Sequence, residues 1–178
     1  DNPGLFSSLK SLTSISNSKR AAIVKEVFDG SNNFMKSGYE MRKVINELNK
    51  IDFNSSEDKH IFGDIYESIL VELRDAGNKG EYYTPRAITQ LMTQMIDPKL
   101  GEKLLDPAAG TGGFLTAAIS HLRDNYVHTV DDEHIVQGSV EGWELKPVAY
   151  VLGLTNLILH GIDVPNYEYV DSLKTEYS

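Results

Sequence analysis

The hydrophobic pattern of roughly the first 80 residues predicts helices throughout. Residues 38–51 carry apolar side chains at the i, i+3, i+4, i+7 spacing of an amphipathic helix. From a cap at Ser55 to Leu73, a wider apolar stripe predicts a helix buried between neighbours. A shorter helix is expected at residues 18–28, after a serine-rich opening that we expect to be only partly ordered. The apolar positions behind these predictions are Ala21, Ala22, Val24, Val27, Met41, Val44, Ile45, Leu48, Ile61, Ile65, Ile69 and Leu73.

The pattern changes after residue 80, where short apolar segments alternate with helical ones. Strand, helix, strand, helix and strand in succession are typical of a doubly wound parallel sheet. We therefore predict a helical domain at residues 1–78 and an α/β domain at residues 79–178. Residues 128–134 in the following polar stretch are expected to be an exposed acidic loop. The predicted strands are 103–106, 139–145 and 167–170, and the predicted helices are 85–96, 113–124 and 147–159, the last closed by Gly161.

Composition narrows the possible functions. The 178 residues have a net charge of −9 and no cysteine, which excludes a disulfide framework and a thiolate metal site. No apolar stretch is long enough to span a membrane and no leader is evident, so we expect a cytosolic protein. The acidity argues against a free-standing nucleic-acid binder, because phosphate contacts require clustered Lys and Arg. A start without Met and a stop soon after a strand indicate a fragment.

The strongest local signal is a glycine-rich turn between the first strand and the next helix. Open α/β sheets bind ligands at this place. Gly110, Gly112 and Gly113 permit positive φ and leave no Cβ in the way of a ligand. Asp106 stands at the strand end, and the following helix start offers N–H groups to an anionic group. A tight turn without a ligand is the alternative interpretation.

The spacing of the turn indicates which ligand to expect. The chain has no Gly-Lys pair for a phosphate loop, and the third glycine of a dinucleotide fingerprint is missing. Glu144 ends the second strand, where a carboxylate can accept both hydroxyls of a ribose. A solvated surface charge is the alternative for Glu144.

Two segments, at residues 80–86 and 106–114, occur in an order that resembles a known family. Asp-Pro-Ala-Ala-Gly-Thr-Gly-Gly-Phe at residues 106–114 resembles the cofactor motif of amino-group DNA methyltransferases, and Gly-Glu-Tyr-Tyr-Thr-Pro-Arg at residues 80–86 resembles their preceding cofactor segment. Leu-Ile-Leu-His-Gly at residues 157–161 and the helical segment before residue 80 resemble the modification subunit of type I restriction–modification systems. The resemblance implies part of a Rossmann-like methyltransferase domain that binds S-adenosylmethionine.

The resemblance also assigns a role to each matching residue. Thr111, Gly112 and Gly113 would meet the cofactor through backbone atoms, with Asp106 and Gly110 shaping the turn. Glu144 would hold the ribose, and Asp171 would lie beside the adenine, unless it only forms a strand-end turn. For Arg86 the alternative is a helix-surface charge. The methionine end of the cofactor would be lined by Glu81, Tyr82, Tyr83, Thr84, Pro85 and Arg86.

The catalytic motif of the family, Asn-Pro-Pro followed by an aromatic residue, does not occur in these 178 residues, so we predict no catalytic residue here. By resemblance, the complete protein methylates adenine in DNA together with a specificity subunit and a restriction subunit, and this chain alone transfers no methyl group. The alternatives are a fragment of an RNA or protein methyltransferase, and an interaction module with a vestigial cofactor site. No metal site is expected, although His128, Asp131, Asp132, Glu133 and His134 lie close together in sequence.

Overall fold

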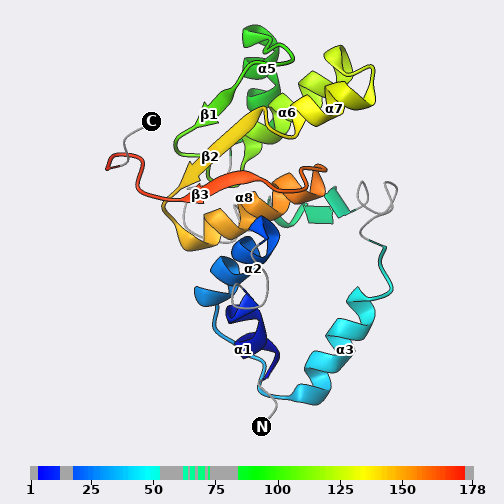
Figure 1. The fold of residues 1–178 in the computed structure, drawn as a ribbon, viewed down its shortest axis with the longest axis vertical. Helices are drawn as coiled ribbons and strands as arrows, with labels where there is room; N and C mark the ends of the chain where they lie inside the picture. Colours follow the sequence, from blue (N-terminus) through cyan, green and yellow to red (C-terminus); the bar gives the residue numbers. More distant parts are fainter. Residues whose placement is uncertain are drawn as a thin grey trace. The chain divides into compact units, whose positions relative to one another are not determined.

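A computed structural model shows the chain as two compact units, Asp1–Ser55 and Ser56–Ser178. Figure 1 draws the chain in colours that follow the sequence. The residues that the structure describes are 4–12, 18–52, 62–63, 65–66, 68–70, 72 and 84–174.

The described residues of the first unit form three helices, each preceded by the residue types that begin helices. Ser18 caps α2, where its hydroxyl accepts a hydrogen bond from the Ala21 N–H at 3.1 Å, and Ser37 caps α3 in the same way. The serine-rich opening, expected to be only partly ordered, includes the helix α1. Phe6 and Phe28 join α1 to α2 through an edge-to-face contact, with ring centroids 5.2 Å apart. The helices are α1 (Leu5–Lys10), α2 (Lys19–Asp29) and α3 (Gly38–Leu48).

The second unit is built on a parallel sheet of three strands in the order β1-β2-β3 (Figure 1). This confirms the predicted α/β class, and each observed strand agrees with its predicted range to within one residue at either end. The helix α6 contacts β1 and β2 of the sheet as well as the helices α5 and α8. The elements are α5 (Arg86–Ile96), β1 (Leu104–Asp106), α6 (Gly113–Tyr126), α7 (Val130–Val136), β2 (Val140–Glu144), α8 (Pro147–Leu159) and β3 (Asn166–Tyr169).

The core of this unit lies between the sheet and the helices α6 and α8. Leu115, Ile119 and Leu157 are fully buried. The helix α5, in contrast, buries Thr89 and Thr93 rather than the apolar stripe that predicted it. The apolar stripe predicted this helix correctly, but the residues of the stripe are exposed in this chain: Ile88, Leu91, Met92 and Met95.

The acidic loop expected after α6 is wrong, because this stretch forms the helix α7. Thr129 and Asp132 make a reciprocal capping box at its start: the Thr129 hydroxyl accepts from the Asp132 N–H, and the Asp132 carboxylate accepts from the Thr129 N–H. Glu133 pairs with Arg123 on α6, at 2.5 Å. Among the described residues, no group of three or more His, Asp or Glu side chains is placed to hold a metal ion.

The division into compact units differs from the boundary predicted at residue 78, since it falls between Ser55 and Ser56. Tyr66 donates its hydroxyl hydrogen to the Leu152 carbonyl at 2.7 Å, which attaches Tyr66 to α8 of the second unit. Leu70 is buried, whereas Ile65 and Ile69 of the predicted buried stripe are more than 40% exposed. Ile61 and Leu73 of that stripe lie outside the described residues. No helix in the described part of the chain is long and apolar enough to cross a membrane.

Candidate functional site

The glycine-rich turn forms the site predicted between β1 and α6. Gly110 and Gly112 have φ of 59° and 76°, a region that favours glycine. Gly112 occupies the N-cap position of α6 and supplies no side-chain cap. The Ala109 N–H donates to the Trp143 carbonyl at 3.0 Å, which attaches the turn to β2. The turn is therefore ordered by its neighbours as well as by its own bonds.

The sequence suggested that all three glycines leave room for a ligand, but the structure shows neighbouring protein atoms beside two of them. A Cβ at Gly112 would lie 3.6 Å from the Gly153 carbonyl oxygen, so this side of Gly112 faces α8 and not open space. A Cβ at Gly113 would lie 3.6 Å from the Thr89 methyl and 4.0 Å from the Thr84 carbonyl oxygen, in ordinary contact with the start of α5. Glycine at position 112 is therefore favoured by its positive φ, and the packing against α8 leaves room for a Cβ.

Glu144 ends β2 with only 8% of its surface exposed, so the alternative of a solvated surface charge is wrong. Its Oε2 accepts a hydrogen bond from the Gly110 N–H at 2.8 Å, and its Oε1 accepts one from the Lys146 N–H at 2.6 Å. Hydrogen bonds to a carboxylate are short and strong. Glu144 thus fixes the turn, and since a carboxylate offers about four acceptor positions, it keeps capacity for other donors.

Asp106 ends β1 and stands beside Gly142 in the sheet register. Its Oδ1 accepts from the Ala108 N–H at 3.1 Å. Burial raises the pKa of the Asp106 carboxyl, the bond from Ala108 lowers it, and the charge of Glu144 raises it, with a net increase. Two carboxylates therefore converge on one side of the turn, where they favour a cation or a hydrogen-bond donor over an anion.

Tyr167 on β3 is a site residue that the sequence analysis missed. Its hydroxyl donates to the Gly110 carbonyl at 2.7 Å, and its side chain is buried. Burial first, and then the charges of Glu144 and Asp106, raise the pKa of Tyr167, so the hydroxyl keeps its proton. The only signal available in the sequence is a tyrosine in an otherwise ordinary strand.

Asn156 on α8 is the second residue that was missed. Its Nδ2 donates to the Thr111 carbonyl at 2.8 Å, and the residue is only 7% exposed. The backbone carbonyl oxygen of Asn156 lies 2.8 Å from Nδ1 of His160, within hydrogen-bond distance. A buried asparagine within an apolar helix is the signal that points to a specific polar partner.

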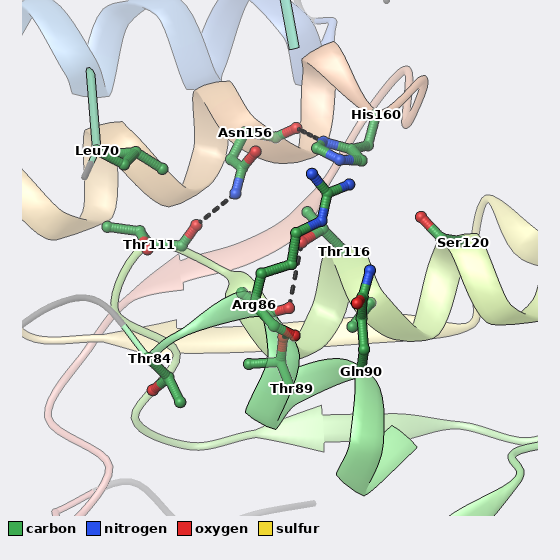
Figure 2. Close-up of a pocket in the computed structure, with 12 residues that line it drawn as sticks. Leu70, Thr84, Arg86, Thr89, Gln90, Thr111, Thr116, Ser120, Asn156 and His160 are labelled. Atoms are coloured by element: carbon green, nitrogen blue, oxygen red, sulfur yellow. Dashed lines mark hydrogen bonds between the residues drawn. The ribbon is translucent and has the colours of Figure 1, made fainter. Parts of the chain in front are cut away.

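A pocket opens beside the turn, between α5, α6 and α8 (Figure 2). The empty space along this open pocket, solvent at its mouth included, is about 470 Å³. Figure 2 shows the Arg86 side chain extending across the pocket toward α8, and the residue is exposed. Predicted residues Thr84, Arg86, Thr111 and Gly113 all line this pocket. The remaining lining residues are Leu70, Thr89, Gln90, Thr116, Ala117, Ser120, Asn156 and His160.

The other predicted residues lie elsewhere. Pro85 precedes α5 as its N-cap residue, one position before the first helical residue where proline was expected. Asp171 follows β3 and accepts a hydrogen bond from the Leu173 N–H at 3.2 Å. Its ion pair with Lys174, at 2.8 Å, lowers the pKa of the Asp171 carboxyl. This is the geometry of a strand-end turn. Glu81, Tyr82 and Tyr83 lie outside the described residues.

Comparison with known proteins defines the class to which this fold and turn belong. The N-6 DNA Methylase family matches residues 57–177, and the chain belongs to this family. The matched range begins almost where the second compact unit begins, at Ser56.

Particular relatives are methylase subunits of type I restriction enzymes. The chain is 52% identical over 165 residues to the EcoEI methylase subunit of Escherichia coli, covering 92% of this chain and 34% of that protein. It is 34% identical over 123 residues to the MjaIX methylase subunit of Methanocaldococcus jannaschii, covering 67% of this chain and 21% of that protein.

Solved structures show the same likeness. A modification subunit from Vibrio vulnificus YJ016 superposes with a TM-score of 0.78 at 43% identity, covering 97% of this chain and 36% of that one. A structure from work on complex assembly and conformational transition of the type I R-M system gives a TM-score of 0.81 at 33% identity, covering 93% of this chain and 34% of that one. The chain thus spans about a third or less of the length of these proteins.

Proposed function

We propose that this chain is the S-adenosylmethionine-binding part of an adenine-N6 DNA methylase subunit of a type I restriction–modification system. The observation that supports the proposal best is the glycine turn at the carboxyl ends of β1 and β2, held by Glu144 and flanked by Asp106. Families of this class use S-adenosylmethionine, which supplies a methyl group from a sulfonium cation when bound.

The chemistry of the residues fits this cofactor. The carboxylates of Asp106 and Glu144 favour the sulfonium cation electrostatically and repel the phosphates of a nucleotide. Glu144 retains acceptor positions for ribose hydroxyls beyond the two that its backbone bonds occupy. Arg86, in the pocket beside Gly113, can pair with the carboxylate at the methionine end. Asp171 would lie beside the adenine, and Glu81, Tyr82 and Tyr83 would complete the methionine end.

The whole protein, in this proposal, methylates adenine in DNA when it is assembled with a specificity subunit and a restriction subunit. The likeness to a structure from work on type I complex assembly supports these partners. DNA would be reached through the assembled complex, in agreement with the net charge of −9 of this chain.

Calorimetric titration of the chain tests the proposal. We expect saturable binding of one S-adenosylmethionine, and of its product S-adenosylhomocysteine, per chain. ATP and NAD serve as controls, since both carry the adenosine group together with phosphates that the two carboxylates repel. If neither S-adenosylmethionine nor S-adenosylhomocysteine binds, the interaction module with a vestigial site is favoured. Equal binding of ATP would contradict the proposed cofactor.

A further inference from the structure

We infer that Tyr167 is a positioning residue of the cofactor site: its hydroxyl holds the Gly110 carbonyl and so orders the glycine turn before any ligand arrives. The inference rests on the proposed function, because it assumes that the turn binds the cofactor. It adds a role for a residue of β3 that the sequence motifs do not include.

Side chains on three elements that follow the turn in the chain form hydrogen bonds with its backbone. At Gly110 the N–H donates to Glu144 of β2 at 2.8 Å, and the carbonyl accepts from Tyr167 of β3 at 2.7 Å. At Thr111 the carbonyl accepts from Asn156 of α8 at 2.8 Å. Consecutive backbone groups of the turn are thus fixed by side chains 34 to 57 positions away along the chain.

Two glycines make room for the Tyr167 ring. A Cβ at Gly142 on β2 would lie 2.5 Å from a Tyr167 ring carbon, and a Cβ at Gly153 on α8 would lie 2.4 Å from the Tyr167 hydroxyl oxygen. Any side chain at either position would displace the ring or the backbone. The tyrosine therefore occupies a slot that the sequence leaves open on both sides, and this slot directs its hydroxyl to the turn.

The slot matters because a glycine turn is costly to order. Gly110 and Gly112 both adopt positive φ, and glycine loses more conformational freedom than other residues when it is fixed. A ligand that had to order the turn would bind more weakly by that amount. Because of the Tyr167 hydrogen bond, this cost is met during folding and not during binding. Loss of the bond should therefore reduce the affinity for the ligand more than it reduces the stability of the fold.

Tyr167→Phe tests the inference, with Tyr66→Phe as a matched control. Tyr66 also donates its hydroxyl hydrogen to a backbone carbonyl at 2.7 Å, but that carbonyl is Leu152 on α8 and not part of the turn. Both variants keep the ring and lose a hydrogen bond to a backbone carbonyl, and Tyr66→Phe also loses a hydrogen bond with the Thr155 side chain. We expect S-adenosylhomocysteine to bind Tyr167→Phe about three- to tenfold more weakly than the unaltered chain, and Tyr66→Phe unchanged.

A second measurement reads the turn without a ligand. Amide hydrogen exchange of residues 109–113 should be faster in Tyr167→Phe than in Tyr66→Phe or the unaltered chain. Equal dissociation constants for the two variants, or equal exchange in the turn, would overturn the inference. If the unaltered chain binds no S-adenosylhomocysteine, the proposed function fails, while faster exchange in Tyr167→Phe alone would still support the positioning of the turn.

Discussion

Removal of the Glu144 side chain should unfold the second unit at markedly lower denaturant concentration. Glu144→Ala leaves the Gly110 and Lys146 N–H groups without the carboxylate that accepts both hydrogen bonds. Hydrogen bonds to a charged group contribute about 1.5 to 3 kcal/mol each, so the loss should be roughly 3 to 6 kcal/mol. At about 4 °C per kcal/mol for a unit of this size, Tm should fall by more than 10 °C.

Glu144→Gln separates the contribution of the two bonds. The amide oxygen can accept one backbone N–H, but the amide nitrogen is a donor and cannot accept the other. About half of the loss in unfolding free energy is therefore expected. Trp143 provides the signal, because it is the only tryptophan of the chain and is buried next to Glu144. Guanidinium denaturation followed by its fluorescence gives the unfolding free energy of each variant.

Glu168→Ala is the matched control, because Glu168 is an exposed glutamate on the neighbouring strand β3. We expect its unfolding free energy to change by less than about 0.5 kcal/mol, as is usual for surface substitutions. If Glu144→Ala were as stable as Glu168→Ala, the two hydrogen bonds would contribute nothing, and Glu144 would be available only to a ligand.

Further predictions concern the proposed cofactor site and the activity of the chain alone. Gly113→Asp puts a carboxylate beside Arg86 in the first turn of α6, where the helix dipole favours a negative charge, so Tm should be nearly unchanged. Calorimetry should show that this variant binds S-adenosylmethionine at least tenfold more weakly, whereas the control Gly113→Ala should bind it normally. Because the folded-state pKa of Asp106 is raised above its usual value near 3.8, stability falls as pH rises above that usual value, and the full cost is present once pH exceeds the raised pKa. Asp106→Asn should therefore have an equal or higher Tm at pH 7. In the same variant, binding of the sulfonium cofactor should weaken more than binding of S-adenosylhomocysteine, and an unchanged ratio of the two dissociation constants would contradict the electrostatic role of Asp106. The chain alone, which contains no Asn-Pro-Pro, should transfer no tritiated methyl group to mixed-sequence DNA; reproducible transfer would refute the assignment of catalysis to that motif.

The sequence predicted β1 and β2 well because each of these strands has a local signal. An apolar run ends at Asp106 or Glu144, and a helix start with glycine or proline follows at once. The same local logic was available for α7, where Thr129 and Asp132 have the spacing of a capping box, but the helix is only seven residues long and mostly polar. Short polar helices give a weak hydrophobic pattern, so a capping motif should outweigh the pattern there.

Burial within helices was harder to predict than the helices themselves. Ile65 and Ile69 lie at correct helical spacing and are exposed, while Tyr66 and Leu70 make the contacts with α8 and the pocket. In α5 the buried side chains are threonines. Periodicity shows that a helix has an apolar stripe, but which neighbour covers the stripe depends on the rest of the fold.

The residues that position the glycine turn could not be found from the turn itself, and Glu144 shows why. A carboxylate at the end of β2 was expected to serve a ribose, yet in the fold it first satisfies two backbone N–H groups. The two functions are compatible, since two acceptor positions remain for two hydroxyls. Tyr167 and Asn156 also hold the turn, and no sequence motif marks them. Their partners lie 57 and 45 positions away along the chain, and only the folded sheet with the helix α8 brings these residues together. A motif search finds groups that face the ligand, whereas the groups that hold those atoms in place become visible only when the hydrogen bonds of each turn residue are followed to their other end.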